Sequence, residues 1–183
     1  VIGVGHYEPL RHYAEVWLNL EPGERGSGIT FSADCPPNTL DLNWQRLIET
    51  HVFERTHPGV LTGSPLTDVR IRLIAGRAHL KHTEGGDFRE ATCRAIRNAL
   101  MQADNVLLEP VVRFELAMPL DALSRVTGEL LRIGAQLDAP ETDEDEVTLT
   151  GSCTAAMFWD YPTKFAASTR GHGRLMSSFW RYE

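Results

Sequence analysis

The stretch YAEVWLNLEP, residues 13–22, carries the first clear structural signal in this 183-residue sequence. Its apolar side chains fall at every second position, at Ala14, Val16, Leu18 and Leu20. Strict alternation puts all four on one face of an extended chain, because successive side chains of a strand point to opposite sides. The stretch therefore predicts an antiparallel strand with one buried face and one solvated face.

Outward from this strand, the first half of the chain predicts a mixture of strands and helices. Turn-forming residues 22–28 lead to a short strand at residues 29–32, and the residues before 13 are interpreted as a segment that precedes the first strand. A helix capped by Asn38 and a later helix opened by Asp87 are predicted next. The first helix stops at Pro58-Gly59, and its apolar residues are Leu40, Trp44, Leu47, Ile48 and Val52. A strand at 66–75 and a polar loop at 76–86 are predicted between the two helices.

The second half of the chain has a different order of predicted strands and helices. One helix begins at Pro119, and another, over residues 157–169, is disturbed by Pro162. The acidic run ETDEDE, residues 141–146, is expected at a solvated hairpin tip. Strands are predicted at residues 111–117, 135–139, 147–153 and 175–182. The resulting order is βαββαβ, which is the ferredoxin-like pattern.

Composition and charge bound the class of protein. Hydrophobic residues make up 42% of the chain and charged residues 23%, which is typical of globular domains and excludes a disordered tail. Residues 105–110 form a junction, so we expect two domains, residues 1–106 and 107–183. The chain holds 18 basic and 25 acidic side chains, so its net charge is −7. This charge argues against a protein that encloses nucleic acid non-specifically, because such binding requires positive charge. The first domain has 11 basic and 13 acidic side chains and the second has 7 and 12, so the first is the better candidate for RNA contact.

Common catalytic and targeting motifs are absent from the sequence. It has no GxxxxGK[S/T] phosphate loop, no GxGxxG and no HExxH, so we expect neither a catalytic residue nor a self-contained enzyme. No apolar run reaches the roughly 18 residues of a membrane span. Cys35, Cys93 and Cys153 are expected to be free thiols in a reducing compartment. The chain begins with Val1 instead of Met, which we interpret as the start of a piece of a longer protein.

The polar loop at 76–86 contains a short basic run. From Arg77 to His82 the loop carries four basic or imidazole side chains, and no acidic residue occurs until Glu84. Arg and Lys bind phosphate oxygens, and His donates to a phosphate or stacks on an unpaired base. The segment before the first strand adds an aromatic ring and further basic side chains. The predicted RNA-contact residues are Tyr7, Arg11, His12, Arg77, His79, Lys81 and His82.

The histidines also allow a metal-binding hypothesis. His6, His12, His79 and His82 lie in these same two segments, and imidazole is a common zinc ligand. If the segments converge, the four side chains would suit the site of a metal-dependent enzyme. Structural zinc sites more often contain cysteines at closer spacings, so these side chains are also interpreted as solvated loop histidines.

Five motifs, in order along the chain, resemble the fourth and fifth domains of elongation factor G, a translational GTPase. YAEVWLNLEP with the following GSG at 26–28 resembles the opening of the fourth domain. The other four are GVLTGSPLTDV at 59–69, GRAH at 76–79 leading to DFR at 87–89, LLEP at 107–110, and TRGHG at 169–173, which is similar to the family's Thr-x-Gly-Arg-Gly. The match is collinear over essentially the whole chain.

Within this family, the chain most resembles the tetracycline-resistance ribosomal protection branch. GHYEPLRHY at 5–13 stands where translocases carry a glycine-rich loop, and GGDFR at 85–89 is similar to the branch's joint between loop and helix. AHLKH at 78–82 departs from the Tyr-Tyr-Ser-Pro-Val of well-known protection proteins. His79 falls where elongation factor G has a tip histidine.

The resemblance implies an α+β fold with two domains, the first like the second domain of ribosomal protein S5 and the second ferredoxin-like. It implies that residues 7–12 and 77–82 are neighbouring tip loops that contact small-subunit rRNA near the decoding centre and tetracycline site. The fifth domain would lie near the GTPase-associated region of the large subunit. GTP and Mg²⁺ would belong to an absent amino-terminal domain, and this piece would hold no cofactor, act on the ribosome as a cytoplasmic monomer and not touch a membrane.

Three alternatives to a ribosomal protection fragment stay open at this point. The first is a fragment of an elongation factor G-like translocase or housekeeping relative. The second is an RNA-binding module of the same fold without a GTPase partner domain. The third is the metal-binding enzyme that would use His6, His12, His79 and His82.

Overall fold

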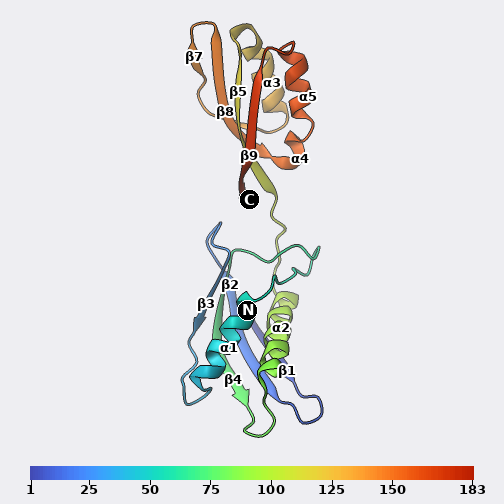
Figure 1. Ribbon diagram of the computed structural model, residues 1–183. Coiled ribbons are helices and arrows are strands. Elements are labelled where there is room, and N and C mark those ends of the chain that lie inside the picture. Colours follow the sequence, from blue (N-terminus) through green and yellow to red (C-terminus); the bar gives the residue numbers. More distant parts are fainter. The chain divides into compact units, whose positions relative to one another are not determined.

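The computed structural model describes residues 1–183, and the chain divides into two compact units, Val1–Leu107 and Leu108–Glu183. Each unit combines one sheet with helices, which confirms the expected α+β class (Figure 1). The first unit contains β1 (Ile2–Tyr7), β2 (Ala14–Pro22), β3 (Ile29–Ala33), α1 (Leu42–Phe53), β4 (Val69–Ala78) and α2 (Gly85–Gln102). No helix in either unit combines the length and the apolar character that crossing a bilayer requires.

The sheet of the first unit has the strand order β1-β2-β4-β3. β1, β2 and β4 pair antiparallel, whereas β3 runs parallel to β4 with α1 as the crossover between them. The alternation predicted for residues 13–22 is confirmed, because Val16 and Leu18 are fully buried and Trp17 between them is exposed. Both helices lie on one face of this sheet (Figure 1). They close a core with the inward side chains of β2 and β4, in which Ile71 of β4 lies with Phe88 and Ile96 of α2.

β1 corrects the interpretation of the first residues as a segment before the first strand. The inward positions of β1 are Gly3 and Gly5, and a Cβ at either glycine would overlap the backbone of Ala95 or Ala91 on α2. α2 therefore packs directly on the strand backbone. The sequence shows no apolar alternation here, because the side chains that would produce it are absent.

Polar side chains of α2 cover the free edge of β1. Asn98 Oδ1 accepts the Val4 amide at 3.0 Å, and the Arg94 guanidinium donates to the His6 carbonyl at 2.9 Å. Gln102 donates to the Ile2 carbonyl at 3.4 Å. The three helix residues are four positions apart and lie on one face of α2. They satisfy edge groups that would otherwise be free to pair with another strand.

Both helices of this unit begin at caps other than those predicted. Asp41, not Asn38, caps α1, because its carboxylate accepts the Asn43 amide at 2.8 Å. Asn38 lies earlier, in the turn before the helix. Asp87 is not the first residue of α2 but lies inside its first turn, where its carboxylate accepts the amide of the N-cap residue Glu84 at 2.8 Å.

β4 also starts and ends later than the predicted strand at residues 66–75. It continues to Ala78, because Arg77 and Ala78 still pair with Glu15 and Ala14 of β2. Gly76 and Arg77 therefore belong to the strand and not to the loop in which they were expected. The basic loop proper is residues 79–84.

The second unit has a sheet in the order β6-β8-β5-β9, all antiparallel, with β7 paired to β8 as a hairpin. This is the strand arrangement of the predicted ferredoxin-like fold. Its elements are β5 (Pro110–Pro119), η1 (Leu120–Ala122), α3 (Leu123–Arg132), β6 (Gln136–Leu137), β7 (Glu141–Asp143), β8 (Glu146–Thr154), α4 (Ala155–Phe158), α5 (Tyr161–Ser168) and β9 (Arg174–Tyr182).

Two predicted features of this unit are confirmed, and one predicted strand is longer than the observed strand. Pro162 separates the predicted helix into α4 and α5, since it lies in the first turn of α5. Residues 141–146 form the exposed β7–β8 hairpin. The strand predicted at 135–139 covers only Gln136–Leu137. The core contains the stacked rings of Phe114 and Phe158, whose centroids lie 5.0 Å apart.

Candidate nucleic-acid interface

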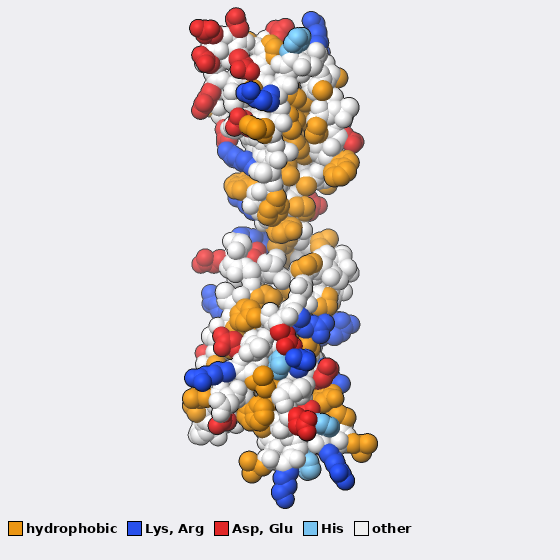
Figure 2. Space-filling model, in the orientation of Figure 1, with side chains coloured by type: hydrophobic (Ala, Val, Ile, Leu, Met, Phe, Trp, Pro, Cys, Tyr) orange, Lys and Arg blue, Asp and Glu red, His pale blue; other side chains and the backbone are white.

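Two loops meet at one end of the first unit, the lower end in Figure 1. Residues 8–13 join β1 to β2, and residues 79–84 join β4 to α2. The Tyr13 amide donates to the His82 carbonyl at 2.8 Å, so the two loops are hydrogen-bonded to each other. Figure 2 shows basic and histidine side chains gathered at this end. The sheet thus brings together two segments that are about 70 residues apart in the sequence.

The β1–β2 loop is a tight turn with a basic residue at its tip. The His12 amide donates to the Pro9 carbonyl at 2.8 Å, which closes the turn. Arg11 has a φ of 65°, in the left-handed region that a non-glycine residue adopts at a cost of about 1 kcal/mol. Its side chain is exposed, and the neighbouring Leu10 is 95% exposed.

The β4–α2 loop is held by its own backbone. The His79 carbonyl accepts the amides of His82 and Thr83, both at 3.0 Å. The Lys81 amide lies 3.3 Å from His79 Nδ1, so this nitrogen is the acceptor and Nε2 carries the proton. The rings of His79 and His82 stack with their centroids 4.6 Å apart. Leu80 between them is fully exposed.

Five of the seven predicted RNA-contact residues lie in these two loops, and two lie in the strands beside them. Tyr7 is the last residue of β1, where its half-buried ring has the Arg94 guanidinium 5.0 Å from its centroid. Arg77 is exposed near the end of β4 and pairs in register with Glu15. One face of the Tyr7 ring is therefore already occupied, and Arg77 has an acidic neighbour across the strands.

Glu15 is the acidic group beside Arg77 at this end of the sheet. Its carboxylate accepts the Trp17 indole N–H at 2.6 Å and the Tyr13 hydroxyl at 3.2 Å. These hydrogen bonds, the Trp17 bond first, and the charge of Arg77 hold the pKa of Glu15 below its ordinary value although burial opposes the shift. Burial and the Glu15 charge in turn raise the pKa of Tyr13. Glu15 thus stays ionised and neutralises part of the charge of Arg77.

His12 lies beside a buried carboxylate that is not among the predicted contact residues. Its Nδ1 is 2.9 Å from Asp87 Oδ1, and Asp87 is only 3% exposed at the start of α2. The other Asp87 oxygen accepts the Glu84 amide. One side chain therefore connects both loops and the helix. The spacing of an acidic residue three positions after the N-cap is the signal that could have identified it.

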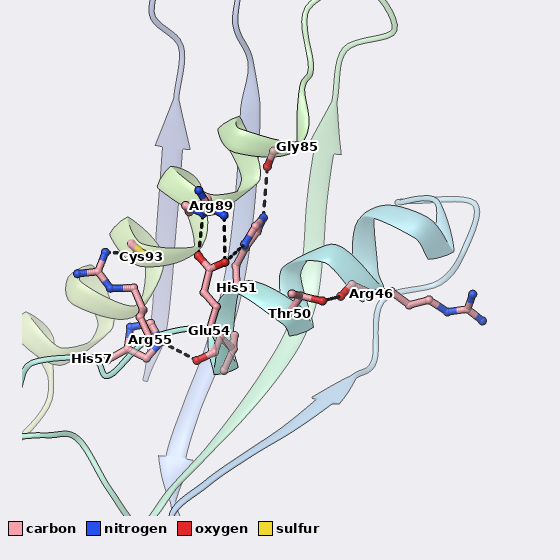
Figure 3. A network of polar contacts seen from close by, with 10 residues as sticks. Arg46, Thr50, His51, Glu54, Arg55, His57, Gly85, Arg89 and Cys93 are labelled. Atoms are coloured by element: carbon pink, nitrogen blue, oxygen red, sulfur yellow. Dashed lines mark hydrogen bonds and ion pairs between the residues drawn. The ribbon is translucent and has the colours of Figure 1, made fainter.

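The first turn of α2, directly after the basic loop, is fixed to the end of α1 (Figure 3). Buried His51 has Nε2 3.3 Å from the Gly85 carbonyl and Nδ1 3.1 Å from the Glu54 carboxylate. Arg89 of α2 donates two hydrogen bonds to Glu54, at 2.7 and 3.1 Å. These bonds, the Arg89 bonds first, hold the pKa of Glu54 below its ordinary value. The network anchors one end of the basic loop.

The four histidines of the metal-binding hypothesis lie in three separate surroundings. His6 lies against Glu8 and Glu15, His12 against Asp87, and the remaining two stack on each other. Nowhere in residues 1–183 do three or more His, Cys, Asp or Glu side chains come together in a way that could hold a metal ion. The geometry therefore does not favour a four-histidine site.

Family models match almost the entire chain. The model described as elongation factor G, domain IV, matches residues 5–104. The model described as elongation factor G C-terminus matches residues 106–183. The two matches divide the chain at nearly the place where the two compact units separate.

Individual proteins similar to the chain carry two kinds of name. The tetracycline resistance protein TetP of Clostridium perfringens is 32% identical over 171 residues, which are 93% of this chain and 26% of that protein. Elongation factor G 2 of Desulfotalea psychrophila is 30% identical over 171 residues, which are 93% of this chain and 25% of that protein. The chain thus spans about a quarter of the length of these relatives.

A solved structure has the same fold. The crystal structure of a protein from Thermus thermophilus matches 99% of this chain and 28% of that protein's chain, with a TM-score of 0.90 and 24% identity.

Proposed function

This chain belongs to the elongation factor G family, and from that premise we propose that it is the ribosome-binding part of a translational GTPase. In this proposal GTP, Mg²⁺ and hydrolysis belong to another domain of the full-length protein, and the chain itself catalyses nothing. Its place of action is the ribosome, as a monomer in the cytoplasm. The second unit lies near the GTPase-associated region of the large subunit.

The first unit contacts small-subunit rRNA through its two joined loops, near the decoding centre and the tetracycline site. The observation that carries this proposal is the hydrogen bond between Tyr13 and His82, which joins two loops with exposed basic side chains. Loops that present cations and rings together suit RNA, which proteins bind through phosphates and unstacked bases. The contact residues are Tyr7, Arg11, His12, Arg77, His79, Lys81 and His82.

Each contact residue has a role that follows from its chemistry. Arg11 and Lys81 are exposed cations without an ion-pair partner, so they bind phosphate oxygens. His79 offers Nε2–H as a donor, and the stacked pair of His79 and His82 offers a ring face to an unpaired base. Tyr7 and Arg77, with Arg94 and Glu15 beside them, act at the margin of the surface.

The test replaces Arg77, His79, Lys81 and His82 by Ala in the full-length protein. We expect weaker binding to ribosomes and a flatter salt dependence, by about one unit of slope for each phosphate contact that the substitutions remove. The matched control replaces Arg46 and Arg97, which are exposed, make no ion pair and lie outside the two loops. Unchanged affinity and slope in the loop variant would contradict the assignment.

Two functions are candidates for the full-length protein, ribosomal protection and translocation, because the relatives include both a tetracycline resistance protein and an elongation factor G 2. We favour ribosomal protection, since residues 5–13 lack the glycine-rich character of the translocase loop. Release of tetracycline from ribosomes by the full-length protein would support this choice. Restoration of translocation in a factor-depleted translation assay would instead support the translocase.

A further inference from the structure

We propose that Thr83 is a positioning residue that holds the two loops in their RNA-binding arrangement, an inference that rests on the proposed function. Its hydroxyl donates to the Tyr13 carbonyl at 2.6 Å and accepts the His79 amide at 2.6 Å. A single side chain therefore connects the first residue of the basic loop to the last residue of the β1–β2 loop. Neither charge nor periodicity marks Thr83 in the sequence.

The backbone adds a second bond at the same place. The Tyr13 amide donates to the His82 carbonyl at 2.8 Å, so both backbone polar groups of Tyr13 are bound by consecutive residues of the other loop. This is the bonding of a short strand pair, with the Thr83 hydroxyl in the place of a backbone amide. The arrangement sets the register of one loop against the other.

The position of the stacked histidines depends on this contact. Besides the bond from its amide to the Thr83 hydroxyl, His79 uses its carbonyl to accept the amides of His82 and Thr83, which closes the loop into one turn. The turn places the two rings at 4.6 Å and brings the Lys81 amide to His79 Nδ1. Removal of the hydroxyl leaves the His79 amide and the Tyr13 carbonyl without their partners, and the bond from the Tyr13 amide to the His82 carbonyl then alone holds the loop to Tyr13.

Thr83 is better placed to position the loops than to contact RNA itself. A hydroxyl has one proton to donate, and this proton is used by the Tyr13 carbonyl. The side chain is half-buried, unlike the fully exposed Leu80 and the exposed Lys81 of the same loop. Its effect on RNA binding must therefore pass through the residues that it holds.

The experiment compares Thr83→Val with Thr83→Ser in the full-length protein. Valine keeps the shape and loses the hydroxyl, whereas serine keeps the hydroxyl. Amide hydrogen exchange of His79 and Tyr13 is measured first, without RNA. We expect about tenfold faster exchange in Thr83→Val, which corresponds to the loss of one hydrogen bond, and wild-type exchange in Thr83→Ser. Unchanged exchange in Thr83→Val would overturn the proposal.

Binding to isolated small ribosomal subunits is measured next. We expect about tenfold weaker binding for Thr83→Val and wild-type binding for Thr83→Ser. We expect a smaller effect when Thr83→Val is added to the four-alanine loop variant, because only the contact residues of the β1–β2 loop are then left to be positioned. An undiminished, about tenfold weakening in that background would mean that Thr83 acts independently of the residues that it holds, and would overturn the positioning role. An unfolding curve for each variant identifies any general loss of fold.

The failures of the two proposals differ in this design. If the four-alanine variant binds like the wild type, the proposed function fails, and the positioning role for RNA fails with it. If the four-alanine variant binds weakly while Thr83→Val binds like the wild type despite faster exchange, the proposed function stands and the positioning role is wrong.

Discussion

The amide of Val4 donates a 3.0 Å hydrogen bond to the side-chain carbonyl of Asn98, so a helix side chain fills the place that a neighbouring strand would take. We expect Asn98→Ala to lower the free energy of unfolding by about 1 kcal/mol, because the amide of an edge strand loses its partner. We also expect concentration-dependent self-association, since an unprotected strand edge pairs with other chains.

Urea unfolding and light scattering would measure these two effects of Asn98→Ala. Arg97→Ala is the matched control, because Arg97 is the adjacent residue of α2, is exposed and has no partner. A variant at Asn98 that stays monomeric at all concentrations would show that Arg94 and Gln102 suffice to protect the edge.

Gly5 lies against the Ala91 backbone of α2, and a Cβ at this position would overlap the Ala91 carbonyl oxygen. We therefore expect Gly5→Ala to lower the free energy of unfolding by about 1–3 kcal/mol, because the helix must move away from β1. Gly86→Ala is the control, since no atom lies within 4 Å of an added Cβ there and alanine favours a helix by about 1 kcal/mol. Equal stability of the two variants would contradict the close packing of α2 on β1.

The hydrogen bonds from Arg89 and then His51 lower the pKa of Glu54, and this shift makes stability depend on pH. The contribution is complete above the ordinary pKa of a glutamate, about 4.5, and is lost as the pH falls through the lower pKa of the folded state. We expect Glu54→Gln to lower stability at neutral pH and to flatten the decrease between about pH 5 and pH 3. Urea unfolding at several pH values measures both effects.

Glu49→Gln is the control for this pH series. Glu49 lies on the same helix, is exposed and has no ion-pair partner. If Glu54→Gln and Glu49→Gln gave the same pH dependence, the ionised Glu54 of the network in Figure 3 would contribute nothing to the pH dependence of stability.

Burial, followed by the charge of Glu129, raises the pKa of Tyr161 well above its ordinary value of about 10. The neutral phenol is the form that the folded second unit prefers, so its contribution is complete below about pH 10 and is lost as the pH rises further. We expect the free energy of unfolding to fall at alkaline pH in the wild type and to fall less in Tyr161→Phe. Tyr182→Phe, at an exposed position of β9, is the control for loss of a phenol.

Much of the fold could be predicted from the sequence, because the spacing of apolar side chains indicates which segments are strands and which are helices. The alternation at Val16 and Leu18 and the order βαββαβ in the second half both follow from side chains that must face a core. β1 could not be found in this way, because Gly3 and Gly5 are small where α2 packs on the strand backbone. The apolar side chains that bury this face of β1 belong to α2, which covers the strand. A search for periodicity along β1 therefore cannot detect the strand.

The candidate site, like the fold, could be predicted from the sequence only in part. Its charged and aromatic residues could be predicted from their chemistry, and Arg11, Lys81 and the two stacked histidines lie together in joined loops. Arg77 was predicted in a loop, whereas its pairing with Glu15 extends the strand. The contacts of Thr83 with Tyr13 and of Asp87 with His12 could not be predicted, because a short polar side chain acquires such a role only from the distant groups that folding brings next to it.

The sequence alone determined the class of the fold, the two-part organisation and the kinds of side chain available for RNA. The family resemblance already implied that the two loops are neighbours. Only the tertiary structure decided which carboxylates face which cations and which residues hold the loops together. The physical reason is that periodicity and composition are properties of neighbours along the chain, whereas Tyr13 and Thr83 are 70 residues apart and become partners only when β2 and β4 pair.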